Sequence, residues 1–278
     1  MAVRVRVLGR TDLGQAMDLL TAHPVDNLFV LSRVASQGID RLRLGCDVYG
    51  AERDGELYAL CHAGSNVVPI HADRVAIEQF AQKLGGRRVS SSIMGRADQV
   101  RPLWETLSRQ FGTEWSKVRD LRPRQPLMVI DHEPLTESDP RVEQVTMADF
   151  DAYFDAAVAM YTEEVGISPL GAGGSYRGYV RSLIKQGRAW GIIENGKVLF
   201  KSDVGSVFGP YCQIQGVWLA PELRGKGVSI PAMSAVVRAV AEHHPVQSLY
   251  VNDFNTRARR LYQTVGFRTA GEFATVLY

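Results

Sequence analysis

The C-terminal half of the chain alternates between helix-like and strand-like patterns of apolar residues. Apolar residues at helical spacing from Phe150 to Met160 predict a helix that Thr146 can cap. The pair Asn195-Gly196 between two strand-like segments is typical of a hairpin. The other expected elements are strands at residues 142–145, 188–194, 197–204, 211–219 and 248–251, helices at 175–186, 228–241 and 255–264, and a closing pair of strands. This order predicts a mixed α/β domain.

The N-terminal half gives a similar outline. Strands are expected at residues 4–8, 48–52, 57–62, 66–70, 89–94 and 127–130, and helices at 13–20, 27–35, 75–84 and 98–111. The pattern Leu-Trp-Glu-Thr-Leu around Trp104 also resembles Leu-Tyr-Gln-Thr-Val around Tyr262. An internal duplication explains both similarities, although so short a match can also arise by chance.

A polar, proline-bearing stretch separates the halves. It runs from Arg122 to Pro140, is interrupted only by the apolar residues 127–130, and shows no apolar period. At 278 residues the chain is also near the size at which a single core stops growing. We therefore expect a domain at 1–130, a linker at 131–140 and a second domain at 141–278.

Composition and charge exclude several classes of protein. Apolar residues make up 45% and charged residues 22%, as in ordinary soluble globular proteins. The net charge of +2 gives no electrostatic footprint for nucleic acid or an anionic membrane, and no apolar run approaches the roughly 18 residues of a membrane span. Cys46, Cys61 and Cys212 lack metal-ligand spacing. We expect a cytoplasmic protein with three reduced thiols, no disulfide, no metal, and no nucleic-acid or membrane partner.

Residues 215–229 carry the strongest chemical pattern. A strand leads into a glycine-rich turn that opens a helix, and the backbone N–H groups of such a turn can bind an anion. Gly225 and Gly227 allow close backbone approach to a diphosphate, while Arg224 and Lys226 add positive charge. From the glycines alone, a simple strand-to-helix connection is the favoured interpretation.

The wider stretch resembles the acyl-CoA-binding motif of the GNAT N-acetyltransferase superfamily. That motif, Arg/Gln-x-x-Gly-x-Gly/Ala, aligns with Arg224, Gly227 and Ser229, where serine replaces the usual glycine or alanine. Downstream, Asn255 and the segment from Ala258 through Leu261-Tyr262 to Gly266-Phe267 look like later elements of the same superfamily. The resemblance covers residues 141–278. It implies a mixed, mainly antiparallel sheet flanked by helices, and two such domains in tandem if the duplication is real.

The resemblance also implies a cofactor site for acetyl-CoA, the acyl donor. Backbone groups of Val217 and Leu219 would pair with the pantetheine arm, Arg224 to Ser229 would cradle the pyrophosphate, and Asn255 would help hold the cofactor. The full expected set is Val217, Trp218, Leu219, Arg224, Gly225, Lys226, Gly227, Val228, Ser229 and Asn255.

Candidate catalytic residues flank this segment. By itself, Tyr262 at helical spacing is a core aromatic. The resemblance places it where many GNAT enzymes carry the general acid, and a phenol of pKa near 10 can protonate a departing thiolate. Glu163 and Glu164 are either a solvated helix end or a base for the acceptor amine, with Asp203 a weaker acidic candidate. The loop 171–174 is either a connector or a lid.

The sequence thus predicts an N-acetyltransferase that acts on a primary amine by direct attack in a ternary complex. The amine could belong to a small molecule or a protein. The alternative is a non-catalytic acyl-CoA-binding module. The N-terminal half lacks a glycine-rich turn and has Trp104 in place of Tyr262, and an indole cannot supply a comparable acid. That half is predicted to be an inactive copy.

Overall fold

The computed structural model describes residues 3–171 and 174–278, which form two compact units. Unit 1 contains the chain up to Leu127 together with Tyr250–Asn255 and Thr269–Tyr278. Unit 2 contains Met128–Leu249 and Thr256–Arg268. Neither unit is contiguous, which differs from the expected division at 131–140, because the C-terminal strand pairs within unit 1.

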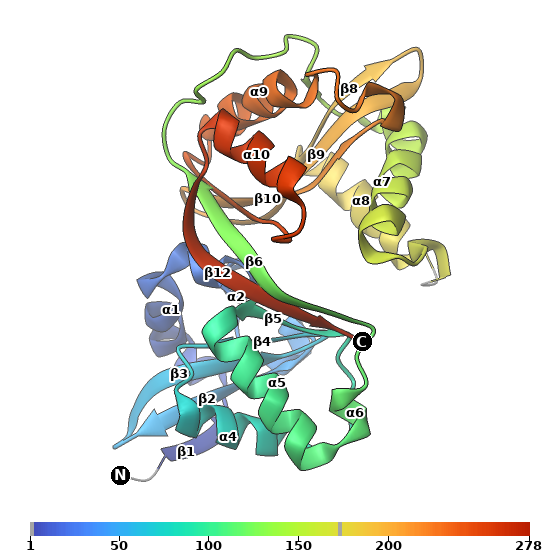
Figure 1. The fold of residues 1–278 in the computed structure, drawn as a ribbon. Helices are drawn as coiled ribbons and strands as arrows, with labels where there is room; N and C mark the ends of the chain where they lie inside the picture. Colours follow the sequence, from blue (N-terminus) through green and yellow to red (C-terminus); the bar gives the residue numbers. More distant parts are fainter. Residues whose placement is uncertain (1–2, 172–173) are drawn as a thin grey trace. The chain divides into compact units, whose positions relative to one another are not determined.

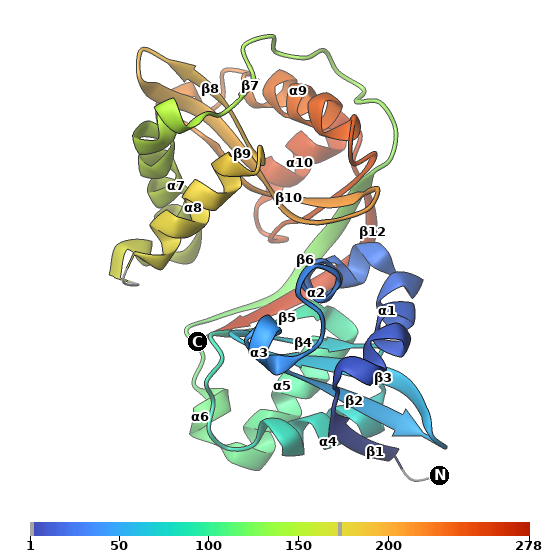
Figure 2. The same ribbon diagram turned by 180° about the vertical axis from the view of Figure 1, so that it is seen from behind.

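Unit 1 is a sheet covered by helices on both faces. Its strands are ordered β1-β2-β3-β4-β5-β12-β6, with β4 and β5 parallel. Figure 1 and Figure 2 show α4 and α5 on one face and α1 and α2 on the other. Its elements are β1 (Val3–Val7), η1 (Arg10–Asp12), α1 (Leu13–Ala22), α2 (Pro24–Gln37), α3 (Arg41–Leu44), β2 (Asp47–Arg53), β3 (Glu56–Ala63), β4 (Asn66–Ile70), α4 (Arg74–Leu84), β5 (Ser92–Arg96), α5 (Ala97–Phe111), α6 (Thr113–Ser116), most of β6 (Asp120–Ile130) and most of β12 (Arg268–Leu277).

Unit 2 has the same construction. Its strands are ordered β6-β11-β10-β9-β8-β7, with β10 and β11 parallel. Helices α7 and α8 cover one face, and α9 and α10 cover the other (Figure 1). Its elements are β7 (Glu143–Gln144), η2 (Met147–Asp149), α7 (Phe150–Val165), η3 (Pro169–Gly171), α8 (Ser175–Lys185), β8 (Ala189–Glu194), β9 (Lys197–Phe208), β10 (Tyr211–Leu219), η4 (Pro221–Leu223), α9 (Ser229–Ala241), β11 (Val246–Tyr250) and α10 (Thr256–Val265).

The two halves of the chain are structural repeats. Apart from short helices, the order strand, two helices, three strands, helix, strand, helix, strand occurs from β1 to β6 and again from β7 to β12. Trp104 lies in α5 and Tyr262 in the corresponding helix α10. The duplication is therefore confirmed at the level of the fold. The last strand of the second repeat, β12, completes the sheet of unit 1 by antiparallel pairing with β5.

Most predicted elements are present, and the exceptions have physical causes. Asn195 and Gly196 have φ of 51° and 73°, as the hairpin requires. The expected closing pair of strands is wrong, because the single strand β12 occupies that region. Arg122–Pro126 is not a linker but part of β6. Its Gln125 is buried and bonded to Asn252 and Thr275, so a polar sequence forms an interior strand.

Candidate active site

Strand β10 separates from its parallel neighbour β11 partway along its length. The pairing of these two described strands runs from Tyr211↔Val246 to Gln213↔Ser248, whereas β10 continues to Leu219. Antiparallel pairing with β9 extends to Leu219↔Phe200. Along its later part, β10 therefore has one backbone edge that is not hydrogen-bonded to β11.

A β-bulge interrupts β10 in this later part. The register moves from Gln215↔Asp203 to Trp218↔Lys201. Between these two pairs, β10 therefore contains one residue more than β9. Gly216 has φ of 61°, and a Cβ atom at this position would collide with the Asp203 carboxylate. Both the backbone conformation and the lack of space therefore require glycine here.

A buried ion pair lies against the bulge. Lys201 has no exposed surface, and its Nζ donates to Asp203 Oδ2 at 2.6 Å and to the Gly216 carbonyl at 2.8 Å. Tyr153 donates its hydroxyl to Asp203 Oδ1 at 2.7 Å. Burial and then the charge of Asp203 raise the Tyr153 pKa well above its ordinary value, so the phenol stays a donor. Sequence reasoning found only Asp203 in this cluster.

The turn after β10 offers backbone donors and positive charge. Gly225 and Gly227 have φ of 80° and 78°, and no heavy atom lies within 4 Å of a Cβ placed on either, so backbone conformation is what requires glycine. Helix α9 begins at Ser229, and no side chain caps its first N–H groups. Arg224 and Lys226 are exposed beside them. Uncapped amides and two cations fit the diphosphate of coenzyme A.

Glu163 connects the end of α7 to this turn. Its carboxylate accepts from Arg224 Nη2 at 2.7 Å and from the Trp218 indole at 3.2 Å. Arg224 Nε also donates to the Leu219 carbonyl at 3.1 Å. Glu163 thus contacts two residues expected in the cofactor site, an arrangement that the sequence did not reveal.

Tyr262 is buried in α10, with its ring against Phe267. Burial raises the pKa of Tyr262 above its ordinary value, and the charge of Glu164 raises it further. Burial also raises the pKa of Tyr176 on α8, with smaller contributions that include Asp203 and Glu164. The charge of Glu164 therefore acts on both phenols, and Tyr262 remains protonated at neutral pH.

Two further predictions concern Asn255 and the loop 171–174. Asn255 is exposed in the connection before α10, where its N–H donates to the Asn252 carbonyl at 3.0 Å. It groups with unit 1, and its part in cofactor binding stays a prediction. Of the loop 171–174, Ala172 and Gly173 lie outside the described residues.

In unit 1 the corresponding helix start is capped. Asp73 accepts from the Ala76 N–H at 2.8 Å, and the Ala72 N–H donates to Gln99 at 3.0 Å. These two amides at the start of α4 are therefore already satisfied within the chain.

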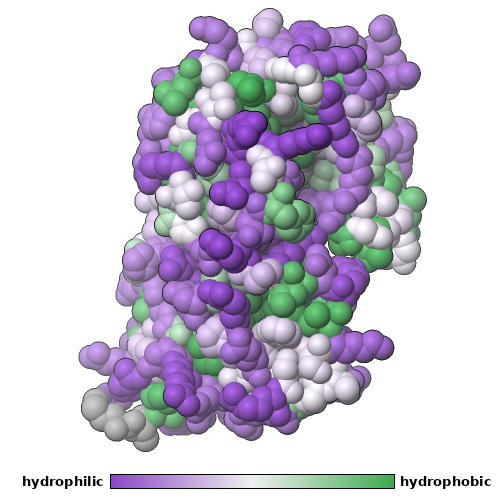
Figure 3. Space-filling model, in the orientation of Figure 1, coloured by the Kyte–Doolittle hydropathy of each residue, from purple (hydrophilic) through white to green (hydrophobic). Residues whose placement is uncertain are grey.

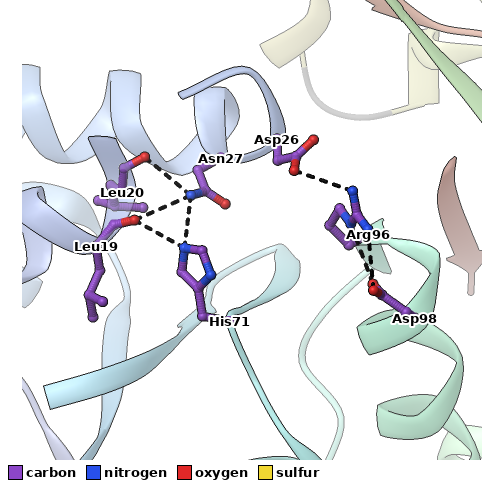
Figure 4. A network of polar contacts seen from close by, with 7 residues as sticks. All are labelled: Leu19, Leu20, Asp26, Asn27, His71, Arg96 and Asp98. Atoms are coloured by element: carbon purple, nitrogen blue, oxygen red, sulfur yellow. Dashed lines mark hydrogen bonds and ion pairs between the residues drawn. The ribbon is translucent and has the colours of Figure 1, made fainter. Parts of the chain in front are cut away.

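Polar contacts also tie the ends of β4 and β5 to helices (Figure 4). His71, just after β4, bonds through Nε2 to the Leu19 carbonyl of α1 at 3.1 Å. Arg96, at the end of β5, contacts Asp26 of α2 at 3.4 Å and Asp98 of α5 at 3.3 Å. Trp104 donates its indole N–H to the Trp115 carbonyl. These features fit a degenerate copy.

Comparison with known families agrees with this geometry. Residues 130–267 match the model of the acetyltransferase (GNAT) family. This half of the chain belongs to the GNAT family. Membership places it among acyltransferases. Residues 46–153 match a domain of unknown function, DUF4081. No curated protein matches the sequence.

Solved structures with the same fold cover nearly the whole chain. A GNAT acetyltransferase from Colwellia psychrerythraea is 12% identical, with 99% of each chain covered and a TM-score of 0.60. A GCN5-related N-acetyltransferase from Sphaerobacter thermophilus is 17% identical, with 99% of this chain and 94% of that chain covered and a TM-score of 0.62. A tandem GNAT protein from the clavulanic acid biosynthesis pathway is 12% identical, with 99% and 98% covered and a TM-score of 0.57. The tandem GNAT fold is therefore confirmed.

Over the described ranges 3–171 and 174–278, no helix has the length and apolar character to cross a bilayer, and no three His, Cys, Asp or Glu side chains gather as metal ligands. All three cysteines are buried and free. On the face drawn in Figure 3, hydrophilic residues are interspersed with small groups of hydrophobic ones.

Proposed function

We propose that unit 2 is an acetyl-CoA-dependent N-acetyltransferase whose acceptor is a primary amine. One observation carries this proposal: the bulged part of β10, free of pairing with β11, leads into a glycine turn and the uncapped start of α9. A strand edge can hold the amide-bearing pantetheine arm, and the turn can hold the diphosphate.

The donor would be held by consecutive parts of one segment. Backbone groups of Val217 and Leu219 would pair with the pantetheine arm, with Trp218 between them. The segment Arg224 to Ser229 would bind the pyrophosphate through its N–H groups and the two cations, and Asn255 would assist. Bound acetyl-CoA supplies an activated thioester carbonyl. The Val217 N–H would donate to that carbonyl oxygen, where negative charge develops during acyl transfer.

Tyr262 would protonate the departing sulfur. Its raised pKa keeps the phenol neutral at physiological pH, which is the state that a general acid needs. A thiol has an ordinary pKa of about 8.5, so the raised pKa of Tyr262 makes proton transfer less favourable than from an ordinary phenol, and the hydroxyl would donate as negative charge develops on the sulfur. The donor and the attacking amine would be held together in a ternary complex, which makes the attack effectively intramolecular.

Glu164 would accept the proton of the acceptor amine, directly or through water. A lysine-like amine, of pKa about 10.4, is almost wholly protonated at neutral pH and must lose a proton to attack. Of the two candidate glutamates, Glu164 is the one whose charge acts on Tyr262, the proposed acid. We therefore assign Glu164 to the amine, whereas Glu163 is paired with Arg224 of the turn.

The test is release of free thiol from acetyl-CoA in the presence of a panel of amines. The panel should include amino acids, polyamines and peptides with free N-termini or lysines. Thiol release that depends on one amine class, with a matching acetylated product in the mass spectrum, supports the proposal. Tight acetyl-CoA binding without turnover against any amine would instead favour a non-catalytic acyl-CoA-binding module.

A further inference from the structure

Lys201 and Asp203 are charged residues in the interior of unit 2. Lys201 has no exposed surface and Asp203 is 5% exposed, yet both lie on β9 and point at the bulge of β10. Desolvation of two charges offsets most of their attraction, so such a pair contributes little stability beyond what apolar residues would give. The role of this ion pair is therefore indicated by its contacts rather than by its contribution to stability.

The contact to Gly216 fixes the direction of one peptide group. The Gly216–Val217 peptide is trans, as are all peptide bonds of the described chain. In a planar trans peptide the C=O and the N–H point in opposite directions. Because Lys201 Nζ holds the Gly216 oxygen at 2.8 Å, the Val217 N–H points away from the ammonium.

The ammonium is itself fixed by its surroundings. Asp203 Oδ2 lies 2.6 Å from Nζ, while the other oxygen of the same carboxylate accepts from Tyr153. The Tyr153 hydroxyl also lies 3.2 Å from the Ser202 carbonyl, and its ring centre is 5.1 Å from Nζ. The hydrogen bonds that run from Tyr153 through Asp203 and Lys201 to Gly216 thus hold the peptide group in this orientation.

We propose that Lys201 and Asp203 are positioning residues that orient the Val217 N–H toward the acyl carbonyl oxygen of the donor. This inference rests on the proposed function for the identity of the donor. The orientation of the peptide itself is a property of the ligand-free protein, so it can be tested separately.

The main variant is Lys201→Met combined with Asp203→Leu. Replacing both partners avoids leaving one buried charge unpaired, so the double variant is expected to fold. Gln247→Met is the matched control, because Gln247 is 1% exposed and its bond to the Val237 carbonyl is equally buried but does not involve the bulge. Asp203→Asn is the second variant if the double variant does not fold, because its one amide oxygen can still accept from Lys201 while its NH2 group donates to the Tyr153 hydroxyl.

The first readout is the Val217 amide resonance of ligand-free, isotope-labelled protein. We expect it to move in the double variant and to stay in place in Gln247→Met. The second is the ratio of calorimetric affinities for acetyl-CoA and CoA. One lost hydrogen bond should reduce the preference for acetyl-CoA by about 3- to 10-fold, with CoA affinity nearly unchanged.

With a known acceptor, the third readout is the division of the effect between kcat and KM. Loss of the oriented N–H donor should lower kcat by about 10- to 1000-fold with little change in the KM for the acceptor amine. A folded variant with an unmoved Val217 resonance and an unchanged affinity ratio would overturn the inference. If the wild-type protein binds no acetyl-CoA, the proposed function fails, and the Val217 resonance still decides whether the pair holds the peptide.

Discussion

Arg224 in the turn and Glu163 at the end of α7 form an ion pair with 2.7 Å between Nη2 and Oε2. Their side chains are 40% and 46% exposed, so the pair contributes little to folding stability. Its consequence concerns binding, because the arginine expected to meet a pyrophosphate is already partly neutralised by a carboxylate.

Removing that carboxylate should strengthen donor binding. In Glu163→Gln, Arg224 keeps its charge and loses a competing anion, so we expect about a 2- to 5-fold lower Kd for acetyl-CoA at low salt, and less at high salt. Calorimetry at two ionic strengths measures this. Glu222→Gln, in the exposed η4 before the turn, controls for a general change in charge. Weaker binding by Glu163→Gln would mean that Glu163 helps to build the site rather than competing for Arg224.

Tyr262→Phe should remove the proton donor while keeping nearly all of the packing. Turnover at saturating donor should fall by about 10²- to 10⁴-fold with almost unchanged acetyl-CoA affinity. Retention of more than about a third of the wild-type turnover, with chemistry rate-limiting, would return Tyr262 to the role of a core aromatic.

The pH dependence of the wild-type rate gives an independent check on Tyr262. Its raised pKa means that the neutral acid persists above the ordinary value of 10.0. The rate should therefore rise as the acceptor amine loses its proton, and no decline from phenol ionisation should appear below about pH 10. A wild-type alkaline decline centred well below pH 10 that disappears in Tyr262→Phe would contradict this environment.

Gly216→Ala should lower the free energy of unfolding by more than the strain of a positive φ alone accounts for. Gly209 also has positive φ, 50°, but a Cβ there meets no atom within 4 Å. Gly209→Ala should cost only the conformational strain, about 1 to 2 kcal/mol. Gly216→Ala should cost more, because its methyl group also meets Asp203. Urea denaturation compares the two, and equal losses would show that the collision is relieved without cost.

The cap of α4 offers a test of unit 1. Asp73→Ala removes the side chain that accepts from the Ala76 N–H and should lower the free energy of unfolding by about 0.5 to 2 kcal/mol. Asp73→Asn, which can still cap, should lose less. Neither change should create a second acetyl-CoA site, because Gln99 still occupies the Ala72 N–H. Equal destabilisation by alanine and asparagine would assign the effect to the Arg53 ion pair instead.

Local patterns in the sequence predicted the repeats and the cofactor segment because turns, glycines and apolar periods determine them. The other features depend on contacts between residues that lie far apart in the sequence. The local pattern of Arg122–Pro126 indicates a linker, because the partners that satisfy Gln125 in the strand lie far along the chain. Lys201 was missed for the same reason, because a lysine in a strand is normally exposed and its acceptor at Gly216 belongs to another strand. The Arg224 bond to Glu163 joins residues 61 positions apart.

We propose a single acetyl-CoA site, at the turn of unit 2, and a calorimetric titration with acetyl-CoA tests this proposal. Gly227→Asp places a side chain and a negative charge at a position with φ of 78° beside the expected pyrophosphate. We expect one acetyl-CoA per wild-type chain and at least about a 10-fold loss of affinity in folded Gly227→Asp. Two molecules per chain, or unchanged affinity in a folded Gly227→Asp variant, would contradict it.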